Sequence, residues 1–478
     1  MTKEIYDIIV IGAGSGGLTI GLFMAKTGFK VLMIARSDLD IGGDCLNDGC
    51  VPSKALIHVS RIAHNARLAA NFGFTISGKV DIKSATDYVY GKQEIIRKHE
   101  NAQWLREQGI DVVLGHAAFS GEKEVEVNGD KFRGKKIVIA TGSRPRKLKV
   151  PGVENVKYYD NESIFHIDRL PDRFLFIGGG PIGMEMAQAF SRLGSHVTVV
   201  QHGSYILQHD QQEMTSILLE QLESEGVEFV FNADIERFSS PNEALVKLTD
   251  GSSQTLSFDA IFVGIGRELE LDSLQLEKAG IEVKDQEIIK NKYLRTTNKH
   301  IFVCGDVAGD LQFSHAAEFH GRILLNNFFS PFKKKLNNDH LSWVTFTDPE
   351  LATFGLNEKQ LNERKISFKK MEQSFEDDDR AVVGNYRYAK IILFIRKGGL
   401  FKKDRILGGS MIAPDAGEIV QELILANTSK LSVNALFNKI YPYPVASRIN
   451  QQVIAHHKEG SLTDLIKKLL HTAFKIFS

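Results

Sequence analysis

Cysteine is scarce in this sequence, and neither sign of charge is in excess. The chain has 478 residues but only 3 cysteines, too few for a disulfide framework. Its 59 Lys and Arg residues balance 59 Asp and Glu residues, which excludes broad electrostatic capture of nucleic acid. No apolar run reaches the ~18–20 residues that span a bilayer, and the N-terminus lacks a signal-peptide layout. We therefore expect a cytoplasmic protein with two to four domains of about 100–200 residues each.

A strand, a glycine-rich loop, a helix and a second strand occur in this order twice. The first copy comprises a strand at 5–11, the loop Gly12-Ala13-Gly14-Ser15-Gly16-Gly17, a helix to about residue 28 and a strand at 30–34. The second comprises a strand at 173–177, the loop Gly178-Gly179-Gly180-Pro181-Ile182-Gly183, a helix to residue 193 and a strand at 196–200. One such loop is weak evidence, whereas two copies in this setting are strong evidence of dinucleotide binding.

The glycines of each loop allow a tight turn, close approach of the backbone to a pyrophosphate, and packing of the helix on the strand. The helix N-terminus adds free N–H groups and partial positive charge. Two loops therefore predict two dinucleotides, and a flavin with a nicotinamide is the economical pair. A structural glycine turn that binds no ligand is a reasonable alternative explanation for one such loop. It is a poor explanation for two loops in the same strand–loop–helix setting.

Two of the three cysteines lie close together, in Cys45-Leu46-Asn47-Asp48-Gly49-Cys50, before a helical stretch from about 53 to 109. A zinc site needs about four ligands, and only Cys304 remains as a further thiolate. Two buried, inert cysteines are the plainer alternative. Next to a flavin fold we favour a dithiol–disulfide couple, because a helix start lowers a thiol pKa. Cys304 is expected to be a core residue on a strand.

The sequence resembles the class I pyridine nucleotide-disulfide oxidoreductases, which include dihydrolipoamide dehydrogenase, glutathione reductase and mercuric reductase. The resemblance extends to about residue 455. It rests on the CxxxxC motif and on five further segments: Ala140-Thr141-Gly142-Ser143 with Pro145, the loop ending in Gly183 with Glu185, Gly264-Ile265-Gly266-Arg267, Cys304-Gly305-Asp306, and Phe346-Thr347-Asp348-Pro349-Glu350.

The resemblance implies catalytic roles for five residues. Cys50 would be the thiolate beside the flavin, and Cys45 the thiol that attacks the substrate. Lys54 would pair with Glu185 at the reactive edge of the flavin ring. Tyr443 would reach the cysteine pair from the partner subunit of a homodimer.

The resemblance also implies a set of cofactor-binding residues. Gly12 to Gly17 would hold the FAD pyrophosphate, Gly115 to Ala117 the adenine, and Asp306 a ribityl hydroxyl, with Ser314 close by. Gly178, Gly180 and Gly183 would hold NADH or NADPH. The complete set is Gly12, Gly14, Gly17, Lys54, Ala117, Thr141, Gly142, Ser143, Gly178, Gly180, Gly183, Gln201, Gly266, Asp306 and Ser314, and no metal site is expected.

The C-terminal part departs from the family pattern. Tyr443 and Arg448 stand where the family usually has the His of a His-Pro pair and the Glu that orients it. A phenol of pKa about 10 is a poor base near neutrality, which disfavours dihydrolipoamide or glutathione chemistry. A tyrosine in this region is similar to mercuric reductase, but residues 470–478 lack the second cysteine pair that receives the metal in that enzyme.

Two strand ends also depart from the pattern. Ala35 stands where an acid usually binds the FAD ribose, and Asp38 and Asp40 lie further along. Gln201 stands where NAD-specific members place Glu, and it is followed by His202. Losing that carboxylate removes repulsion of a 2′-phosphate, but no arginine follows to bind one, so we expect tolerance of both NADH and NADPH.

Residues 459–478 extend past the resemblance as an expected amphipathic helix. Its apolar residues are Leu462, Leu465, Ile466, Leu469, Leu470, Phe474 and Phe477, and its basic ones are Lys467, Lys468, His471 and Lys475. The first expectation is packing against the interface domain of the same chain. The alternative is reversible contact with an anionic membrane surface.

The predicted fold is α/β, with two Rossmann-like domains for FAD and NAD(P)H and a C-terminal α+β dimerisation domain. The expected divisions are 1–150 and 275–340 for FAD, 151–274 for NAD(P)H, 341–458 for the interface and 459–478 for the tail helix. Further buried strands are expected at 136–142, 258–266 and 299–306.

The predicted function is FAD-dependent transfer of electrons from NAD(P)H through Cys45 and Cys50 to a disulfide or other thiol-reactive acceptor, in the manner of mercuric reductase. Dihydrolipoamide dehydrogenase is one alternative. A flavin-bound redox sensor or interaction protein without efficient turnover is another.

Overall fold

The computed structural model describes residues 5–309, 312–396, 398, 404–459 and 462–478. The chain divides into two compact units. The first is Met1–Ser204 with Gly226–Asn337, and the second is Tyr205–Glu225 with Asn338–Ser478. Each unit has its own sheets and its own hydrophobic core.

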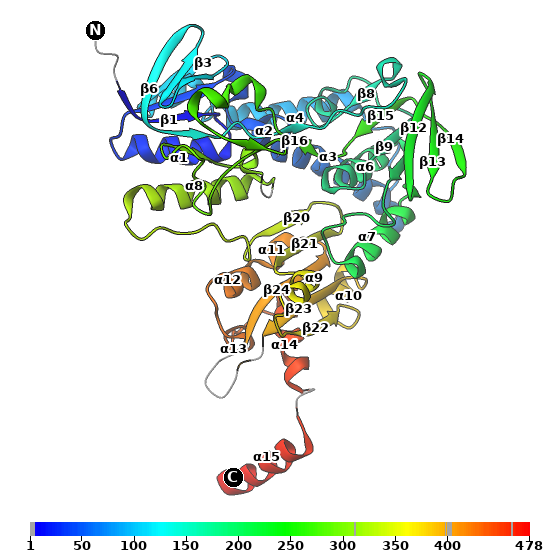
Figure 1. Cartoon of the computed structure of the whole chain (residues 1–478). Coiled ribbons are helices and arrows are strands. Elements are labelled where there is room, and N and C mark those ends of the chain that lie inside the picture. Colours follow the sequence, from blue (N-terminus) through cyan, green and yellow to red (C-terminus); the bar gives the residue numbers. More distant parts are fainter. Residues whose placement is uncertain (1–4, 310–311, 397, 399–403, 460–461) are drawn as a thin grey trace. The chain divides into compact units, whose positions relative to one another are not determined.

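The first unit contains a seven-stranded sheet in the order β3-β2-β1-β6-β5-β4, with β19 beside β6. Figure 1 labels β1, β3 and β6 of this sheet. Its strands are β1 (Ile5–Ile11), β2 (Val31–Ala35), β3 (Ile110–Leu114), β4 (Ala118–Gly121), β5 (Glu124–Val127), β6 (Asp130–Ile139) and β19 (Ile301–Val303). All pairs are parallel except those of β4 and β5. The strand predicted at 5–11 is confirmed at both ends. β19 joins this sheet from far along the chain, so the unit is discontinuous in sequence.

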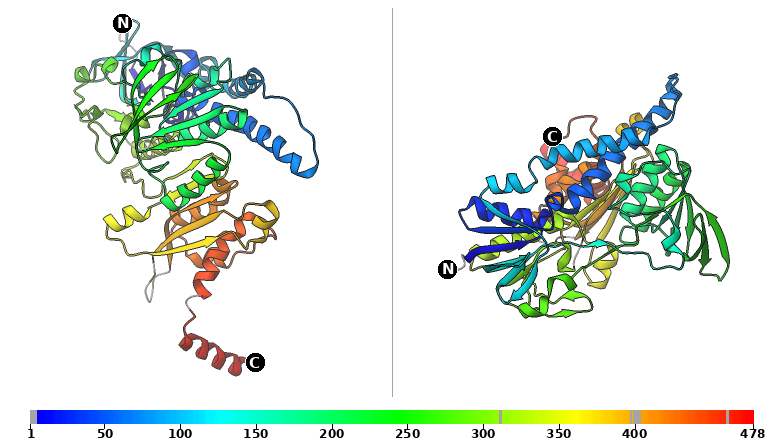
Figure 2. Two further views of the ribbon diagram at one scale, coloured as in Figure 1. Left: turned by 90° about the vertical axis from the view of Figure 1, so that its right-hand side faces the viewer. Right: turned by 90° about the horizontal axis from the view of Figure 1, so that it is seen from above.

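Six α-helices accompany this sheet: α1 (Ser15–Lys26), α2 (Gly43–Asn47), α3 (Cys50–Leu68), α4 (Ile82–Arg97), α5 (Ala102–Glu107) and α8 (Ser314–Phe329). α3 and α4 pack side by side as a long helical pair (Figure 2). α1 packs closely on α8, because a Cβ at Gly16 would lie 3.2 Å from the carbonyl oxygen of Ala317 in α8 and one at Gly321 would lie 2.9 Å from the Thr19 side chain. The same Cβ at Gly16 would lie 2.7 Å from Cys304 Sγ. Cys304 is therefore a core residue, as predicted; it is 1% exposed, and burial raises the pKa of its thiol to about 12.

A second, parallel sheet of the same unit has the order β11-β10-β9-β15-β8. Its strands are β8 (Tyr158–Tyr159), β9 (Arg173–Ile177), β10 (His196–Gln201), β11 (Glu228–Phe231) and β15 (Ala260–Val263), with α6 (Pro181–Leu193) between β9 and β10. Buried Phe174, Phe176 and Phe190 pack their rings between β9 and α6. The repeated strand–loop–helix–strand pattern therefore folds into two Rossmann-like sheets, as predicted.

Smaller antiparallel sheets complete the first unit. They are formed by β12 (Ala233–Ser240), β13 (Glu243–Leu248) and β14 (Ser253–Ser257); by β7 (Arg144–Pro145) and β16 (Arg267–Glu268); and by β17 (Val283–Lys284) and β18 (Glu287–Ile288).

The second unit is built on an antiparallel sheet in the order β20-β21-β24-β23-β22. Its strands are β20 (Ser342–Thr345), β21 (Glu350–Gly355), β22 (Lys369–Ser374), β23 (Lys390–Arg396) and β24 (Arg405–Ala413). Its helices are α7 (Gln212–Ser224), α9 (Glu358–Glu363), α10 (Asp379–Gly384), α11 (Ala416–Ile419), α12 (Gln421–Thr428), α13 (Val433–Phe437), α14 (Ile449–Glu459) and α15 (Asp464–Phe477). α7 groups with this unit because it packs on β21 and β24. The expected α+β character from residue 341 onward is confirmed.

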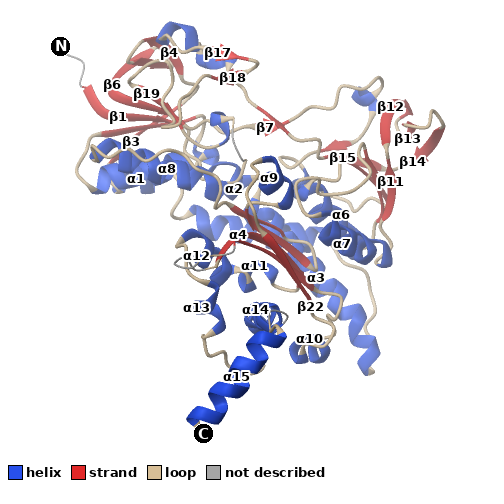
Figure 3. Ribbon diagram, turned by 60° about the horizontal axis from the view of Figure 1, so that its bottom comes forward, coloured by secondary structure: helices blue, strands red, loops and turns tan. Residues whose placement is uncertain are grey.

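The C-terminal helix α15 is continuous to Phe477 (Figure 3). None of its residues is buried, and Leu465 and Phe477 are 69% and 87% exposed. The expected packing against the interface domain of the same chain is therefore not found. Gly460, in the segment that precedes the helix, lies outside the described residues. Among the helices that the structure describes, none combines the length and the apolar character needed to cross a membrane.

Candidate active site

The first glycine loop joins β1 to α1 in a turn that only glycine fits. Gly12 has φ +108°, and a Cβ there would lie 2.2 Å from the carbonyl oxygen of Ala140. A Cβ on Gly17 would lie 2.1 Å from the carbonyl oxygen of Gly12. Gly14 is the N-cap of α1, and no side chain caps that helix. The loop therefore has the bare backbone and helix N-terminus that a pyrophosphate requires, so these residues fit FAD.

The second loop repeats this construction between β9 and α6. Gly178 has φ +106° and a Cβ there would lie 2.4 Å from the carbonyl oxygen of Gly264, while a Cβ on Gly183 would lie 2.3 Å from that of Gly178. Gly180 is the N-cap of α6, also without a side-chain cap. The same steric constraints thus produce a second dinucleotide cradle, which fits a nicotinamide dinucleotide.

The two strand ends behave differently. At the end of β2, Asp38 accepts a hydrogen bond from the Ala102 N–H at 2.6 Å and Asp40 binds the Arg36 guanidinium at 2.6 Å. Both acids that follow Ala35 are therefore held by the protein itself. At the end of β10, the Gln201 carboxamide oxygen accepts from the Gly179 N–H at 2.7 Å, so Gln201 reaches into the second loop.

His202, next to Gln201, binds a carboxylate of the same unit. Its Nδ1 lies 2.8 Å from an Asp234 carboxylate oxygen, and both side chains are exposed. The end of β10 thus combines the neutral amide of Gln201 with the pair that His202 forms with Asp234.

The two paired cysteines lie on consecutive helices. Cys45 is in α2, and Cys50 is the first residue of α3. Both are free thiols, and Cys50 Sγ lies 3.4 Å from Ser314 Oγ at the start of α8. The hydrogen bond with Cys45, with help from Ser314 and the charge of Lys54, lowers the pKa of Cys50 to about 6. The same hydrogen bond raises the pKa of Cys45, and burial adds to the shift. The geometry therefore favours a Cys50 thiolate beside a protonated Cys45.

Lys54 and Glu185 form an ion pair between the two Rossmann-like parts of the unit. Lys54 Nζ lies 2.7 Å from a carboxylate oxygen of Glu185, and the two side chains are 35% and 4% exposed. Lys54 is one turn beyond Cys50 on α3, whereas Glu185 is on α6. The structure thus brings together Cys45, Cys50, Lys54 and Glu185. Ser314, which the resemblance placed near Asp306, lies against Cys50.

A polar network that the sequence did not reveal connects the cysteine segment to Asp306. Ser143 Oγ donates to Asp306 at 2.6 Å and accepts from Arg267 Nε at 2.7 Å. The same guanidinium donates to Asp44, next to Cys45, at 3.1 Å, and Asn161 donates to that carboxylate at 3.1 Å. Burial raises the pKa of Asp306, against the effects of Ser143 and Arg267. Arg267 therefore bridges the expected ribityl-binding acid and the cysteine segment.

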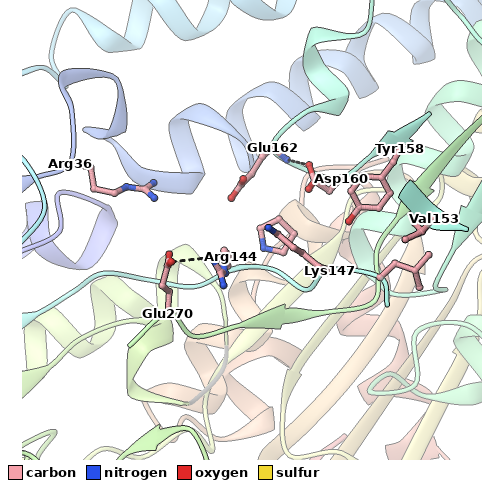
Figure 4. A pocket seen from close by; sticks show the side chains of 10 residues that line it. Arg36, Arg144, Lys147, Val153, Tyr158, Asp160, Glu162 and Glu270 are labelled. Carbon is pink, nitrogen blue, oxygen red and sulfur yellow. Dashed lines mark hydrogen bonds and ion pairs between the residues drawn. The ribbon is translucent and has the colours of Figure 1, made fainter. Parts of the chain in front are cut away.

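Asp48, between the two cysteines, lies in an acidic environment. Burial, together with the negative charges of Asp44 and Glu162, raises the pKa of Asp48 to about 7. Glu162 also lines a cavity of about 460 Å³ whose rim carries the Arg144–Glu270 ion pair (Figure 4). None of the predicted site residues lines this cavity.

The other predicted cofactor residues occupy turns at strand ends. Gly142 follows β6 with φ +71°, and Gly266 precedes β16 with φ +101°. Thr141, just before Gly142, is exposed, whereas Ala117 before β4 is buried. These positions are compatible with backbone contacts to a bound nucleotide.

Tyr443 lies in the second unit and is 68% exposed. Its hydroxyl donates to Asp379 at 3.0 Å, and the guanidinium of Arg448 lies 5.5 Å from its ring centre. The hydrogen bond to Asp379 raises the pKa of Tyr443, so less of its basic form, the phenolate, is present near neutral pH. The neighbouring Tyr441 donates to Glu422 at 2.7 Å, a pairing that no sequence motif indicated.

Comparison with known proteins agrees with this site. Residues 6–321 match the pyridine nucleotide-disulphide oxidoreductase family, and residues 341–453 match its dimerisation domain. A mercuric reductase of Lysinibacillus sphaericus is 30% identical over 450 residues, which cover 93% of this chain and 81% of that protein. A dihydrolipoyl dehydrogenase of Thermus scotoductus is 31% identical over 467 residues, which cover 95% and 98%.

Among solved structures, the Cu(II) complex of the HOCl-induced flavoprotein disulfide reductase RclA from Escherichia coli superposes with a TM-score of 0.82. It is 26% identical in sequence and covers 95% of this chain and 99% of that one. Fold, glycine loops and dimerisation domain all point to one family.

The chain belongs to the pyridine nucleotide-disulphide oxidoreductase family. It is an FAD-dependent NAD(P)H:disulfide oxidoreductase, and its dimerisation domain supports a homodimer.

Proposed function

We propose that Cys45 and Cys50 are the redox couple of this enzyme and that they carry electrons from NAD(P)H to a thiol-reactive acceptor. The observation that carries this proposal is the cysteine pair at the start of α3, next to the Lys54–Glu185 ion pair. Each turnover oxidises one NAD(P)H and transfers two electrons, and with a disulfide acceptor it takes up one proton and releases two thiols.

In this proposal each protein group has one task. Bound FAD supplies two-electron transfer between the nicotinamide and the cysteine disulfide. Cys50 is held as a thiolate by Cys45, Ser314 and Lys54. Cys45 retains its proton until a disulfide acceptor binds. Its sulfur then forms a mixed disulfide with one acceptor sulfur while the proton passes to the other, which leaves as a thiol. The Cys50 thiolate next attacks Cys45, re-forms the Cys45–Cys50 disulfide and releases the second acceptor sulfur, which takes a proton from water. Glu185 keeps the Lys54 ammonium in place through the 2.7 Å contact.

The binding assignments implied by the resemblance are part of the same proposal. Gly12, Gly14, Gly17, Ala117, Thr141, Gly142, Ser143, Asp306 and Ser314 serve FAD; Gly178, Gly180, Gly183, Gln201 and Gly266 serve NAD(P)H. We also propose the division of the chain at residues 150, 274, 340 and 458 into the FAD, NAD(P)H, interface and tail segments. Because Gln201 is neutral, we propose that both NADH and NADPH are accepted.

For the acceptor we propose a species whose reduction does not need a histidine base. Tyr443 is exposed, and its hydrogen bond to Asp379 raises its pKa, which argues against dihydrolipoamide as the substrate. A thiol-binding metal ion or a reactive disulfide is a better candidate acceptor for a cysteine pair that has no histidine base beside it. The relatives named mercuric reductase and the Cu(II) complex of RclA support a metal ion among the acceptors.

We further propose that Tyr443 contacts the acceptor across the homodimer interface, and that the enzyme makes peripheral contact with a membrane through residues 459–478. The support for the first is the family's dimerisation domain, and for the second the unburied amphipathic helix α15.

A panel of acceptors tests the proposed function. NAD(P)H consumption is followed with disulfides, quinones, and Hg(II) or Cu(II) thiol complexes, using wild type, Cys45→Ala and Cys304→Ala. We expect turnover with at least one thiol-reactive acceptor, its loss in Cys45→Ala, and little change in Cys304→Ala, since Cys304 is a core residue. Reduction that stops after one equivalent with every acceptor would instead support a redox sensor.

A further inference from the structure

Helix α15 has two well-separated faces. At about 100° per residue, Leu465, Ile466, Leu469, Leu470 and Ile476 fall within one arc of about 140°, and Ala473 and Phe477 lie in the same arc. Phe474 lies about 40° outside this arc, next to Lys467. All the large apolar residues of this arc are at least 39% exposed, so the apolar face has no cover in this chain.

The opposite face of α15 is basic. It carries Lys467, Lys468, His471 and Lys475. The one acid of the helix, Asp464, is its first residue, where a carboxylate stabilises the positive end of the helix dipole. Thr463 caps the helix N-terminus, because its hydroxyl oxygen accepts a hydrogen bond from the Ile466 N–H at 3.4 Å. The chain as a whole has no net charge, so this basic face is a local property.

The combination of an apolar face and a basic face on α15 matches one of three possible environments for the helix. A buried core would cover the apolar arc but would not need lysines concentrated on the other side. A transmembrane segment would need about 20 apolar residues, whereas α15 has 14 residues, of which 6 are polar. An apolar arc opposite a lysine-rich arc is the arrangement of helices that lie in the plane of an anionic membrane surface.

We infer that α15 binds anionic phospholipid bilayers, with Leu465, Leu469 and Ile476 among the acyl chains and Lys467, Lys468 and Lys475 at the lipid phosphates. This inference rests on the peripheral membrane contact proposed above and adds its lipid class and orientation; it does not depend on which acceptor the enzyme reduces. A single helix of this length binds weakly and reversibly, and two copies on one homodimer strengthen binding through avidity.

Vesicle co-sedimentation of the full-length, FAD-loaded enzyme tests the inference. Vesicles are phosphatidylcholine alone or phosphatidylcholine with about one-third phosphatidylglycerol. We expect pelleting with the anionic vesicles, at least tenfold weaker partitioning to the neutral ones, and release at high salt, because about 1 kcal/mol per lysine is a factor of about five for each charge.

Two matched variants separate the apolar face from charge. Leu469→Glu and His471→Glu place the same carboxylate at exposed positions about 160° apart around α15, the first in the apolar arc and the second on the basic face. We expect Leu469→Glu to lose at least tenfold more partitioning than His471→Glu, because only the first puts a charge among acyl chains. NAD(P)H oxidation without vesicles should be the same in both, which checks that both are folded.

Each of the other possible results would overturn one part of the inference: the anionic selectivity, the orientation of the helix or the membrane contact. Equal pelleting with neutral and anionic vesicles would remove the anionic selectivity but leave the membrane contact. Equal losses in the two glutamate variants would remove the assigned orientation. No pelleting of wild type with either vesicle would overturn the membrane contact itself, and protection of α15 amides from hydrogen exchange in that case would indicate packing within the dimer.

Discussion

The two Rossmann-like halves of the first unit have the same loop construction but different surroundings. In both, the first glycine lies against a backbone carbonyl from a neighbouring strand end, Ala140 or Gly264, and the last glycine lies against the first. They differ at the next strand end, where Ala35 has no polar side chain and Gln201 binds its own loop. The shape of each loop is thus set by close contacts between its glycines and backbone carbonyl groups, and this shape suits any dinucleotide. The choice of nucleotide depends instead on the residue at the end of the next strand, Ala35 or Gln201.

The halves also differ in redox chemistry. Cys45 and Cys50 belong to the first half, and the second half contributes Glu185 to the ion pair at the cysteine segment. The following predictions test this division of tasks, from the largest expected effect to the smallest.

Gly17→Ala and Gly183→Ala introduce the same clash in different halves, at 2.1 Å and 2.3 Å from a carbonyl oxygen. We expect Gly17→Ala to be purified without FAD. Gly183→Ala should retain FAD and its visible absorbance but should no longer be reduced by NAD(P)H, although dithionite still reduces it. Absorbance spectra and anaerobic titration measure both. Gly91→Ala, where a Cβ meets nothing within 4 Å, is the control. Loss of the same nucleotide in both loop variants would contradict the assignment.

Cys50→Ala should abolish the long-wavelength absorbance band of a thiolate beside the flavin in the NAD(P)H-reduced enzyme, while Cys304→Ala should retain it. The pKa of Cys50 is lowered to about 6, so the thiolate is present above that pH and is protonated as the pH falls through it. The band should therefore be half lost near pH 6 and complete by about pH 7. A band that is absent from the wild type, or that persists in Cys50→Ala, is incompatible with the proposed redox couple.

Lys54→Met should lower the free energy of unfolding by about 3 kcal/mol, because it leaves the 4%-exposed Glu185 carboxylate without its ammonium partner. This is the low end of the range for buried pairs, since 35% of Lys54 is exposed. The double variant Lys54→Met/Glu185→Leu should recover most of the loss in urea unfolding at saturating FAD. Lys157→Met, which breaks the exposed pair with Asp168, should cost less than about 1 kcal/mol. Equal costs for the two lysines would show that the Lys54–Glu185 pair is not a buried one.

Gln201→Glu should make the second half selective for NADH. The new carboxylate would still accept from the Gly179 N–H but would repel a 2′-phosphate, so we expect the KM for NADPH to rise about tenfold relative to that for NADH. Gln254→Glu adds the same charge on β14, away from the loop, and should change neither KM. An unchanged ratio in Gln201→Glu would place coenzyme recognition elsewhere.

Much of the fold could be predicted from local patterns. The strands at 5–11 and 173–177 end where the apolar runs end, because a glycine turn follows each at once. Cys304 was predictable as a core residue because it follows a short buried strand. The network through Arg267 was not, because its partners Ser143 and Asp44 are 124 and 223 residues away and no local pattern marks such pairs.

Two other features required the structure. Residues 205–225 contain an ordinary amphipathic helix, and only the tertiary contacts of α7 with β21 and β24 assign it to the second unit. The tail could be recognised as amphipathic, but periodicity alone cannot tell a covered apolar face from an exposed one, and the expectation of packing on the same chain was wrong.

The sequence by itself determined the chemistry that depends on neighbours along the chain. The two loops need glycine at fixed spacings because of steric contacts within one turn. The cysteine pair can be recognised because Cys45 and Cys50 are five positions apart and immediately precede a helical stretch. The tertiary structure decided what depends on convergence and burial: that Lys54 meets Glu185 across 131 residues, that Asp38 and Asp40 are held by the protein, and that α15 stays uncovered. Ion pairing and solvent exposure are set by which segments the folded chain brings together.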